Sequence, residues 1–561
     1  MAQTSSLERA AAPVVRRGPL ARLAALPLDM RLLAVIAVLA LALRLWPLGG
    51  APTDYDEGVY WQSLRSMAAG HALYTQIFSS QPPGFLLSVY PFYAVLGHTL
   101  AAARFGVVVY SLVGLAAMYA AGRMLGGRWV GLAAFALLAL DPTYVKESHT
   151  LQAEAPAIAF EMLCVALAIA ASLRLSGGRA NRGWAPVLAA ASGAALAFGM
   201  LIKLFDVVAL LPALLCLLAP VYPAFRLDGR RGRLRGRAEL IAGLRAALPP
   251  LSLFAAGFVL ASLIVLVPFF GRWDVFYAQV VSFHLAAEHA ANQGPWYNIT
   301  FMFLAGELYP LALLALVGIV VAVRRRQTVL VLTPALWAGV SFVLLLGQQP
   351  LFDHHRVLLS PALALTAACA LPLLFATRAL NADHARNGKR RMGTPTPAID
   401  DAGVSPAPNV RPKGAAAQYA LAALLAVLLL GVGLSGIDDK VAAAAPTALQ
   451  MQVARAIEGL TVPADVVASD DQYVVALAGR NVPPELVDTS LVRIKAGDLR
   501  AARLEAILIR DDVRVILFSS GRFALIPGFE DWVRANYTQV LDLGDGRGIF
   551  VKAPRSPVVT T

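Results

Sequence analysis

Long apolar runs separated by short polar connections recur along most of this chain. A helix that crosses a bilayer needs roughly 20 apolar residues, with about 17 as a practical minimum. By that measure we place eleven spanning helices, at residues 32–48, 101–122, 128–145, 153–173, 186–202, 204–221, 247–269, 300–323, 329–347, 357–377 and 417–436. The pattern predicts a helical protein that crosses the membrane many times.

One apolar run does not fit this series. Residues 83–97 read PGFLLSVYPFYAVLG, which is too short to cross a bilayer and is interrupted by Pro91. A short apolar helix beside a spanning helix is typical of a segment that lies in the membrane interface. We therefore predict a juxtamembrane helix here, within the first external loop.

The pattern changes twice near the C-terminus. Residues 378–416 are rich in Pro, Gly, Ala and basic residues, which predicts a flexible cytoplasmic linker before the last spanning helix. From residue 437 onward the apolar positions follow strand and amphipathic-helix periods. The runs ADVVASD (464–470) and VRVILFSS (513–520) predict buried strands, and DLRAARLEAILIR (498–510) and EDWVRANY (530–537) predict helices. Residues 437–561 are thus expected to form a small external α/β domain.

Composition agrees with a membrane protein. Of the 561 residues, 58% are apolar and 15% are charged, and the mean hydropathy is +0.64. Soluble domains usually have about a quarter charged residues. The net charge of +13 would suggest nucleic acid in a soluble protein, but in a membrane protein it reflects topology, so no nucleic-acid partner is expected. The three cysteines lie inside apolar runs, which favours buried thiols over disulfides.

The distribution of basic residues predicts the topology. Loops on the cytoplasmic side are enriched in Lys and Arg. Most basic residues fall in the N-terminal segment 1–31 and in the connections that follow the even-numbered spans, including the run at 226–237, the triplet at 324–326 and the linker. The predicted external loops carry Arg65, Arg104, Lys146, Arg272 and Arg356. We expect a multi-pass protein of the cell membrane with a cytoplasmic N-terminus, an uncleaved first span and an external or periplasmic C-terminal domain.

Acidic residues gather where the first span ends. The stretch TDYDEGVYWQ (53–62) places Asp54, Asp56 and Glu57 in the first external loop. A charged loop end is one explanation. However, Glu154, Lys203 and the segment FDHHR (352–356) fall on the same predicted side. Ionisable residues at helix ends in a membrane protein are costly and suggest function, so these groups are candidates for one shared site.

The order of these residues resembles a known family. Asp56-Glu57 with Tyr60, the loop AAGHALYTQIFSSQPPG (68–84), Arg104, GRMLGG (122–127), Glu154, Lys203 within GMLIKLFD, and the late histidine and arginine loop follow one another along residues 40–377. This series resembles the GT-C glycosyltransferases, in particular the branch of the dolichyl-phosphate-mannose protein mannosyltransferases and the lipid A aminoarabinose transferase. The resemblance implies a transmembrane catalytic domain over residues 32–377. It also implies transfer of a sugar, with inversion, from a polyprenyl-phosphate carrier to an acceptor at the outer face.

The chemistry of such a transfer assigns roles to the candidates. An acceptor hydroxyl attacks the anomeric carbon, and a carboxylate must take its proton; Asp56 is our choice. A second carboxylate, Glu57 or Glu154, could orient the acceptor, and Asp56 with Glu154 could hold a divalent cation such as Mg, Mn or Zn. The lipid phosphate needs a cationic partner. We assign Lys203 and Arg356 to it, with His355 beside them.

Further substrate contacts are expected from Asp54, Tyr60, Arg104 and Gln81. Gln81 stands where the aminoarabinose-transferase branch has a basic residue, so the phosphate-binding role is not carried over to it. The sugar stays open, and so does the acceptor, which could be a glycan, a lipid or a protein. Two other functions also stay open: a transporter or flippase for polyprenyl-linked lipids, and an inactive homologue whose external domain binds a partner.

Two further motifs carry less weight. His284, Glu288 and His289 could suggest a metal site, but a polar loop that caps the site is the simpler interpretation. The tripeptide at residues 298–300 matches an N-glycosylation sequon in a predicted external loop, which is a very common match.

Overall fold

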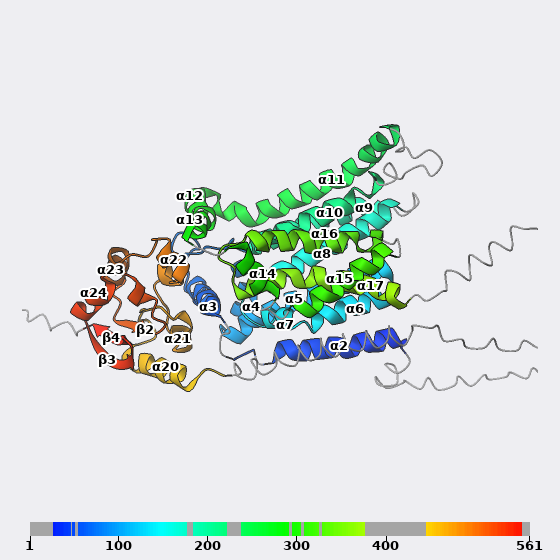
Figure 1. Ribbon diagram of the computed structural model, residues 1–561. Helices are drawn as coiled ribbons and strands as arrows, with labels where there is room; N and C mark the ends of the chain where they lie inside the picture. Colours follow the sequence, from blue (N-terminus) through cyan, green and yellow to red (C-terminus); the bar gives the residue numbers. More distant parts are fainter. Residues whose placement is uncertain are drawn as a thin grey trace, which may run out of the picture.

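The computed structural model describes residues 26–46, 48–50, 54–176, 183–221, 237–290, 294–303, 308–324, 328–375 and 445–552. Figure 1 shows a bundle of roughly aligned helices with a small mixed domain at one end. The predicted linker at 378–416 and the predicted last span at 417–436 lie outside the described residues. We call the end of the bundle that faces residues 445–552 the domain end.

The bundle is built from apolar helices. They are α2 (Leu28–Leu45), α5 (Leu100–Gly126), α6 (Arg128–Ala139), α8 (Glu154–Ser176), α9 (Ala185–Ile202), α10 (Leu210–Leu217), α11 (Arg237–Leu266), α15 (Tyr309–Arg324), α16 (Thr328–Gly347) and α17 (Ser360–Phe375). Among the described residues, four stretches are long and apolar enough to cross a membrane: Leu100–Gly126, Glu154–Ser176, Ala185–Ile202 and Ala238–Ala286. The helical membrane fold is thereby confirmed, whereas the total of eleven spans stays a prediction.

Several predicted spans are interrupted. The span at 128–145 ends at Ala139, and a separate helix α7 (Pro142–Glu147) follows because Asp141 caps it through Tyr144 N and Pro142 occupies its first position. The span at 204–221 begins as the 3₁₀ helix η2 (Leu204–Ala209), because Lys203 has extended backbone angles. The span at 300–323 overlaps α14 (Pro295–Phe303) and α15, and residues 304–307 lie outside the described residues.

Small residues let the central helices approach closely. A Cβ atom built on Gly193 of α9 would lie 1.9 Å from the carbonyl oxygen of Phe254 in α11. A Cβ atom on Gly257 of α11 would lie 2.0 Å from the carbonyl oxygen of Ala190. Glycines at such crossings are typical of membrane helices that pack backbone to backbone. The α9–α11 contact therefore depends on these two glycines.

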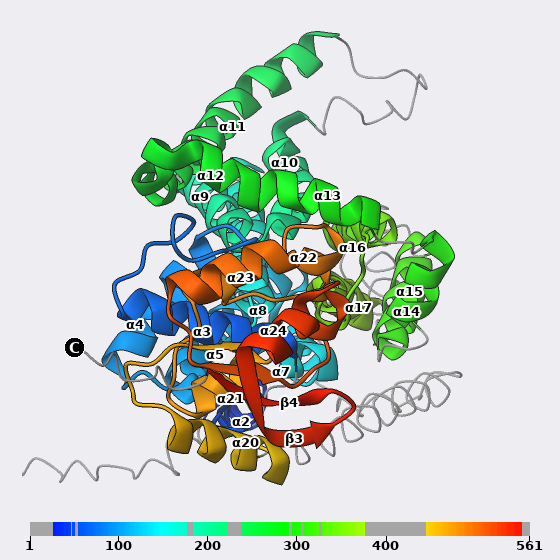
Figure 2. The same cartoon turned by 90° about the vertical axis from the view of Figure 1, so that its left-hand side faces the viewer.

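Short helices occupy the domain end of the bundle. They are α3 (Tyr55–Ala68), α4 (Gly84–Val95), α12 (Trp273–Tyr277), the π-helix η5 (Ala278–Ser282) and α13 (Phe283–Ala290), and α3 lies between the bundle and the C-terminal domain (Figures 1 and 2). α4 covers the run at 83–97 that was predicted to lie in the interface. Its 12 residues are too few to span a bilayer. α11 continues into α12–α13, so this helix is longer at both ends than the predicted span at 247–269.

The C-terminal domain is a small α/β unit. Its elements are α20 (Ala448–Leu460), β1 (Val467–Ser469), α21 (Gln472–Leu477), α22 (Leu491–Lys495), α23 (Ala501–Arg510), β2 (Val515–Phe518), α24 (Phe529–Asn536), β3 (Tyr537–Gly544) and β4 (Arg547–Lys552). The sheet order is β1-β2-β4-β3, with β1 parallel to β2 and the other pairs antiparallel. Phe518, Phe523, Phe529 and Phe550 fill its core. The two predicted strands and the two predicted helices are confirmed.

Candidate active site

Four elements meet at the domain end of the bundle. α8 begins at Glu154, Lys203 follows the last residue of α9, the 3₁₀ helix η6 (Asp353–Leu359) carries His354, and Asp54 caps the start of α3. Helix ends therefore bring these polar groups to one place, although they lie up to 300 residues apart in the chain. The structure thus joins Asp54, Glu154, Lys203 and His354 into one cluster.

Glu154 and Lys203 form its buried ion pair. Lys203 Nζ donates a hydrogen bond to Glu154 Oε1, and both side chains are less than a tenth exposed. The second carboxylate oxygen, Oε2, is buried and accepts no hydrogen bond. A buried acceptor without a partner is costly, so this oxygen faces a position that a substrate or water group could fill.

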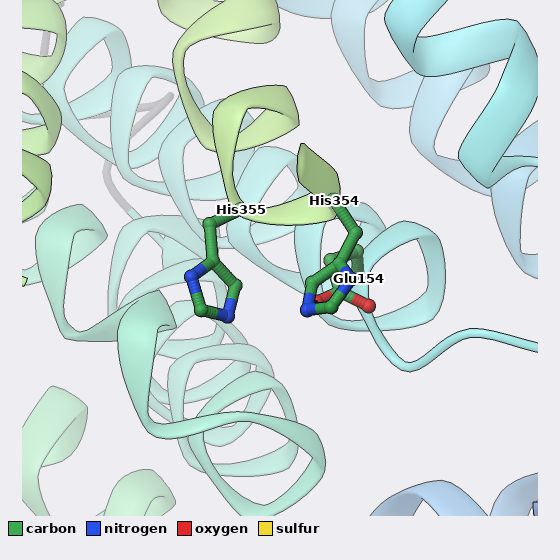
Figure 3. Close-up of side chains that lie close together, drawn as sticks. All are labelled: Glu154, His354 and His355. Atoms are coloured by element: carbon green, nitrogen blue, oxygen red, sulfur yellow. The ribbon is translucent and has the colours of Figure 1, made fainter. Parts of the chain in front are cut away.

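His354 connects Glu154 to the loop before α3. Its Nδ1 lies 2.9 Å from Asp54 Oδ2, and its Nε2 lies 3.6 Å from Glu154 Oε1. Figure 3 shows the ring of His354 lying over Glu154, with His355 beside them. Burial alone would lower the pKa of His354, but the charges of Glu154 and Asp54 raise it, which favours the imidazolium. Burial would likewise raise the pKa of Asp54, but His354 lowers it to about 2.

Asp56 differs from its neighbour Asp54. It stands in the first turn of α3, where its backbone N–H donates to Asp54 Oδ1 at 3.3 Å, and it is partly exposed. Burial raises the pKa of Asp56 to about 7, although the charge of His354 opposes the shift. A carboxylate with a pKa near the working pH is suited to accept a proton in a reaction.

Glu57 and Arg104 form a structural pair. Arg104 donates to both carboxylate oxygens of Glu57, at 2.8 and 3.0 Å, and also to the carbonyl oxygens of Leu48 and Gly50. Glu57 Oε2 accepts a further hydrogen bond from Leu151 N at 2.6 Å. Both side chains are buried and saturated by protein groups. In the structure both side chains tie α3 to the bundle, and the substrate roles expected for Glu57 and Arg104 stay predictions.

Tyr60 and Gln81 border the cluster. The buried ring of Tyr60 packs edge-on against Phe85, with ring centres 4.7 Å apart. Burial raises the pKa of Tyr60, and the charges of Asp56 and Glu154 add to the shift. Gln81 contributes its backbone oxygen, which accepts from the Tyr74 hydroxyl at 2.9 Å. Gln81 therefore shapes the loop before α4, and its side chain has no assigned contact.

His355 and Arg356 are neighbours on η6 but contact different groups. His355 lines a small pocket together with Glu154, Lys203 and Phe205. Burial lowers the pKa of His355 well below its usual value, and the charge of Lys203 adds to the effect, so this imidazole is neutral. Arg356 instead binds the Asp353 carboxylate, and its guanidinium lies over the ring of Phe301. Arg356 thus pairs with a carboxylate of its own helix, and its role as a ligand of the lipid phosphate stays a prediction.

Two groups of side chains offer ligand atoms for a metal ion. Glu154, His354 and His355 form one group, and Asp54, Asp56 and His354 form the other, with ligand atoms within 4.8 Å of one another in each. In the first group the Lys203 ammonium already contacts Glu154, and it would repel a cation there. The second group has two carboxylates and an imidazole, which suit a divalent cation, so it fits better.

Several residues of this region were missed by sequence reasoning. Glu147 at the end of α7 is buried, and burial together with the charge of Glu154 raises its pKa to about 7. Lys146 forms an ion pair with Asp353 at 2.5 Å. Neither residue stands in a motif. An acidic residue in an apolar setting, as at Glu147, was a signal that could have pointed to the site.

The sequon at residues 298–300 is not accessible in this fold. Asn298 is buried and donates to three backbone carbonyls, so it is no glycosylation acceptor.

His284 lies in α13, where its Nδ1 is 2.9 Å from the carbonyl oxygen of Val280 in η5. The side chains of Glu288 and His289 lie outside the described residues, so the metal alternative for this loop stays an expectation.

Comparison with known proteins agrees with this geometry. Residues 80–227 match the family described as dolichyl-phosphate-mannose-protein mannosyltransferase. Among curated proteins no sequence matches this chain significantly. The fold is similar to ArnT from Cupriavidus metallidurans in the apo state, with a TM-score of 0.55 and 16% identity over 94% of this chain and 99% of that one.

Two other solved structures carry ligands. ArnT from Cupriavidus metallidurans bound to undecaprenyl phosphate has a TM-score of 0.56 and 17% identity, over 94% of this chain and 98% of that one. The archaeal oligosaccharyltransferase AglB from Archaeoglobus fulgidus, in complex with an inhibitory peptide and a dolichol-phosphate, has a TM-score of 0.52 and 12% identity, over 95% of this chain and 75% of that one. The chain therefore has the same overall fold as these solved structures.

Proposed function

We propose that this protein is an inverting membrane glycosyltransferase that moves a sugar from a polyprenyl-phosphate carrier to an acceptor at the outer face of the membrane. One observation supports this most. At one end of the bundle, the partly exposed carboxylate of Asp56 belongs to the same cluster as two cationic side chains, Lys203 and His354. A transfer from a lipid phosphate needs a base for the acceptor and positive charge for the leaving group.

Asp56 acts as the general base. As the acceptor oxygen bonds to the anomeric carbon, the acceptor proton passes to the Asp56 carboxylate. The bond between the anomeric carbon and the phosphate oxygen breaks, and its electron pair stays on the phosphate. The polyprenyl phosphate therefore leaves with an added negative charge, and the sugar configuration inverts.

Lys203 binds the leaving phosphate in this proposal. Its ammonium lines the small pocket beside Glu154, His355 and Phe205 and already balances a negative charge there. A lipid phosphate that enters the pocket gains a charge-assisted hydrogen bond from Lys203. Glu154 then keeps Lys203 in place, and His354, held by Asp54, lies on the acceptor side of the same cluster.

One group of side chains in this cluster suits a divalent cation. Asp54, Asp56 and His354 are the residues that would hold it, and a bound cation would supply positive charge beside the acceptor. The two roles of Asp56 exclude each other, since a carboxylate bound to a cation is a poor base at neutral pH. We assign Asp56 to the base, because burial raises its pKa to about 7.

Release of the sugar from its carrier tests the proposal. Purified protein is incubated with radiolabelled polyprenyl-phosphate sugar and a cell-envelope fraction as the source of acceptor. We expect labelled acceptor to form together with free polyprenyl phosphate, and Asp56→Asn to abolish both. Movement of intact donor across a vesicle membrane without release would instead support a flippase. Donor binding without either reaction would support an inactive homologue.

A further inference from the structure

The helix that carries Asp56 is held from two sides. On the bundle side, Glu57 binds Arg104, and Tyr60 packs on Phe85. On the other side, α21 of the C-terminal domain packs along α3 (Figure 2). The bundle contacts explain why α3 stays on the membrane domain. The C-terminal contacts, described below, fix α3 from the opposite side.

The side chain of Gln62 forms hydrogen bonds to backbone groups of the C-terminal domain. Its side chain is fully buried, and its amide N–H groups donate to the carbonyl oxygens of Gln472 at 3.3 Å and Arg480 at 3.1 Å. Its amide oxygen accepts from Val482 N at 3.4 Å. A buried side chain whose donors and acceptor all pair with backbone of another unit specifies one relative position of the two units.

Gly58 marks a contact between two backbones. A Cβ atom built on Gly58 would lie 2.7 Å from the backbone nitrogen of Tyr473, at the start of α21. Real Cβ atoms essentially never come so close to another heavy atom. Any larger residue at position 58 must therefore move α3 and α21 apart.

Tyr55 is held in a socket of the C-terminal domain. Its hydroxyl accepts a hydrogen bond from Thr489 N at 2.8 Å and shares a second one with Thr489 Oγ1 at 3.1 Å. The Arg522 guanidinium lies over its ring, 3.8 Å from the ring centre. Tyr55 is the residue directly before Asp56. The socket therefore sets the position of the first turn of α3, which carries the proposed base.

We propose that the C-terminal domain is a positioning part of the transfer site, which holds α3 through Tyr55, Gly58 and Gln62 and so sets where Asp56 meets the acceptor. This inference rests on the proposed function. Misplacement of a reacting group by about 1 Å can cost on the order of 100-fold in rate.

A matched pair of glycine substitutions tests it. Gly58→Ala places a methyl group against α21, whereas Gly459→Ala places one on α20, where a Cβ atom meets nothing within 4 Å. Both replace a helical glycine, a change that by itself favours a helix. For Gly58→Ala we expect faster hydrogen–deuterium exchange in residues 55–68 and a kcat lowered between about 10- and 100-fold. We expect the donor Kd to stay within about twofold, because Lys203 lies on another element.

Gly459→Ala should behave as the wild type in exchange, kcat and donor Kd.

A second pair of variants removes one hydroxyl group each. Tyr55→Phe loses the hydrogen bonds between the Tyr55 hydroxyl and Thr489, and Tyr537→Phe loses a hydrogen bond to Val513 O inside the C-terminal domain. Tyr55→Phe should lower kcat about 3- to 10-fold at unchanged donor Kd, as expected for lost positioning without lost donor binding. Tyr537→Phe should leave kcat unchanged.

The outcomes separate the two proposals. Wild-type exchange and turnover in Gly58→Ala, or in Tyr55→Phe if Gly58→Ala does not fold, would overturn the positioning role while the glycosyltransferase activity stands. A lower kcat together with an equally weakened donor Kd would also overturn it, because that pattern indicates general loss of structure. If the wild type transfers no sugar, the proposed function fails, and the exchange measurement alone decides whether the C-terminal domain holds α3.

Discussion

Two adjacent carboxylates on α3 show how position alone assigns a role. Glu57 is buried and receives hydrogen bonds from Arg104 and Leu151 N, so its charge is fully used within the protein. Asp56 is partly exposed, and the charge of His354 acts on it. Successive residues on a helix point about 100° apart, so one of the two faces the bundle and the other faces the cluster.

The first residue-scale prediction concerns Asp56 as the base. Asp56→Asn keeps the shape of the side chain and removes its basicity, so we expect turnover to fall at least about 100-fold while donor binding persists. Initial rates and equilibrium binding of the labelled donor measure the two effects. Asp545→Asn in the exposed β3–β4 turn is the control and should have wild-type rates. Activity of Asp56→Asn within a few-fold of the wild type would contradict the assignment.

The second prediction concerns pH. Because burial raises the pKa of Asp56 to about 7, its carboxylate is protonated in acid and cannot accept the acceptor proton. We expect kcat/KM to rise with pH and to reach half its plateau near pH 7, instead of near the usual value of about 4 for an aspartate. A pH series of initial rates at low donor concentration measures it. A midpoint below about pH 5 would favour a cation-bound Asp56.

The third prediction separates charge balance from phosphate binding. Lys203→Met leaves the Glu154 carboxylate buried without its cation, which typically costs about 3–5 kcal/mol of stability. Adding Glu154→Gln removes that charge, so the double variant should recover most of the thermal stability. Donor affinity should stay low in both, because the phosphate has lost Lys203. Recovery of donor binding along with stability would show that Lys203 serves the fold alone.

At the scale of elements, the bundle is held by backbone contact as well as by side-chain packing. α9 lies between α8 and α11, and its small residues at this crossing admit no side chain. Since lipid tails are as apolar as the helix surfaces, close packing contributes much of the association between membrane helices. The position of Lys203 at the end of α9 follows from this packing.

Gly193→Ala tests that packing. The added methyl group would lie 1.9 Å from the Phe254 carbonyl oxygen, so α9 and α11 must separate. Overpacking of this kind typically costs about 1–3 kcal/mol, and we expect a lower Tm of the purified protein in detergent. Gly339→Ala on α16 is the matched control, because a Cβ atom there meets nothing within 4 Å. Equal Tm values for the two variants would contradict the close-contact interpretation.

At the scale of the whole molecule, the site and the C-terminal domain occupy the same end of the bundle (Figure 1). Helix α8 begins at Glu154 in the cluster and ends at Ser176, and its 23 residues span about 35 Å. Ser176 therefore lies on the opposite side of a bilayer from the site. The side that faces outward is still a prediction, which depends on the distribution of basic residues.

Labelling of single cysteines tests this topology. The native cysteines are buried, which keeps the background low. With an impermeant maleimide and intact cells, Asp545→Cys and Gln76→Cys, both at exposed positions, should react, and Ser176→Cys should react only after the membrane is opened. Reaction of Ser176→Cys in intact cells would invert the topology and place the site on the cytoplasmic side.

The sequence by itself determined the helical membrane class, the extent of most long helices and the strands of the C-terminal domain. These features depend on local composition, because a bilayer or a buried sheet imposes a length and a period on each segment. The apolar pattern did not predict interruptions of helices such as the one at Asp141. Apolar content continues across them, and a single capping residue decides where one helix ends and the next begins.

The topology expected from the sequence placed Asp54, Glu154, Lys203 and the segment 352–356 on one side, as candidates for one site. Only the tertiary structure decided which of their side chains touch, because contacts between the ends of α8, α9 and η6 leave no local signal in the chain. The sequence assigned Asp56 to the base and left Glu57 as a candidate for orienting the acceptor, and only the packing of α3 showed that Glu57 pairs with Arg104. The contact of the C-terminal domain with α3 was also invisible in the sequence, because it joins residues more than 400 positions apart through backbone groups that every sequence has.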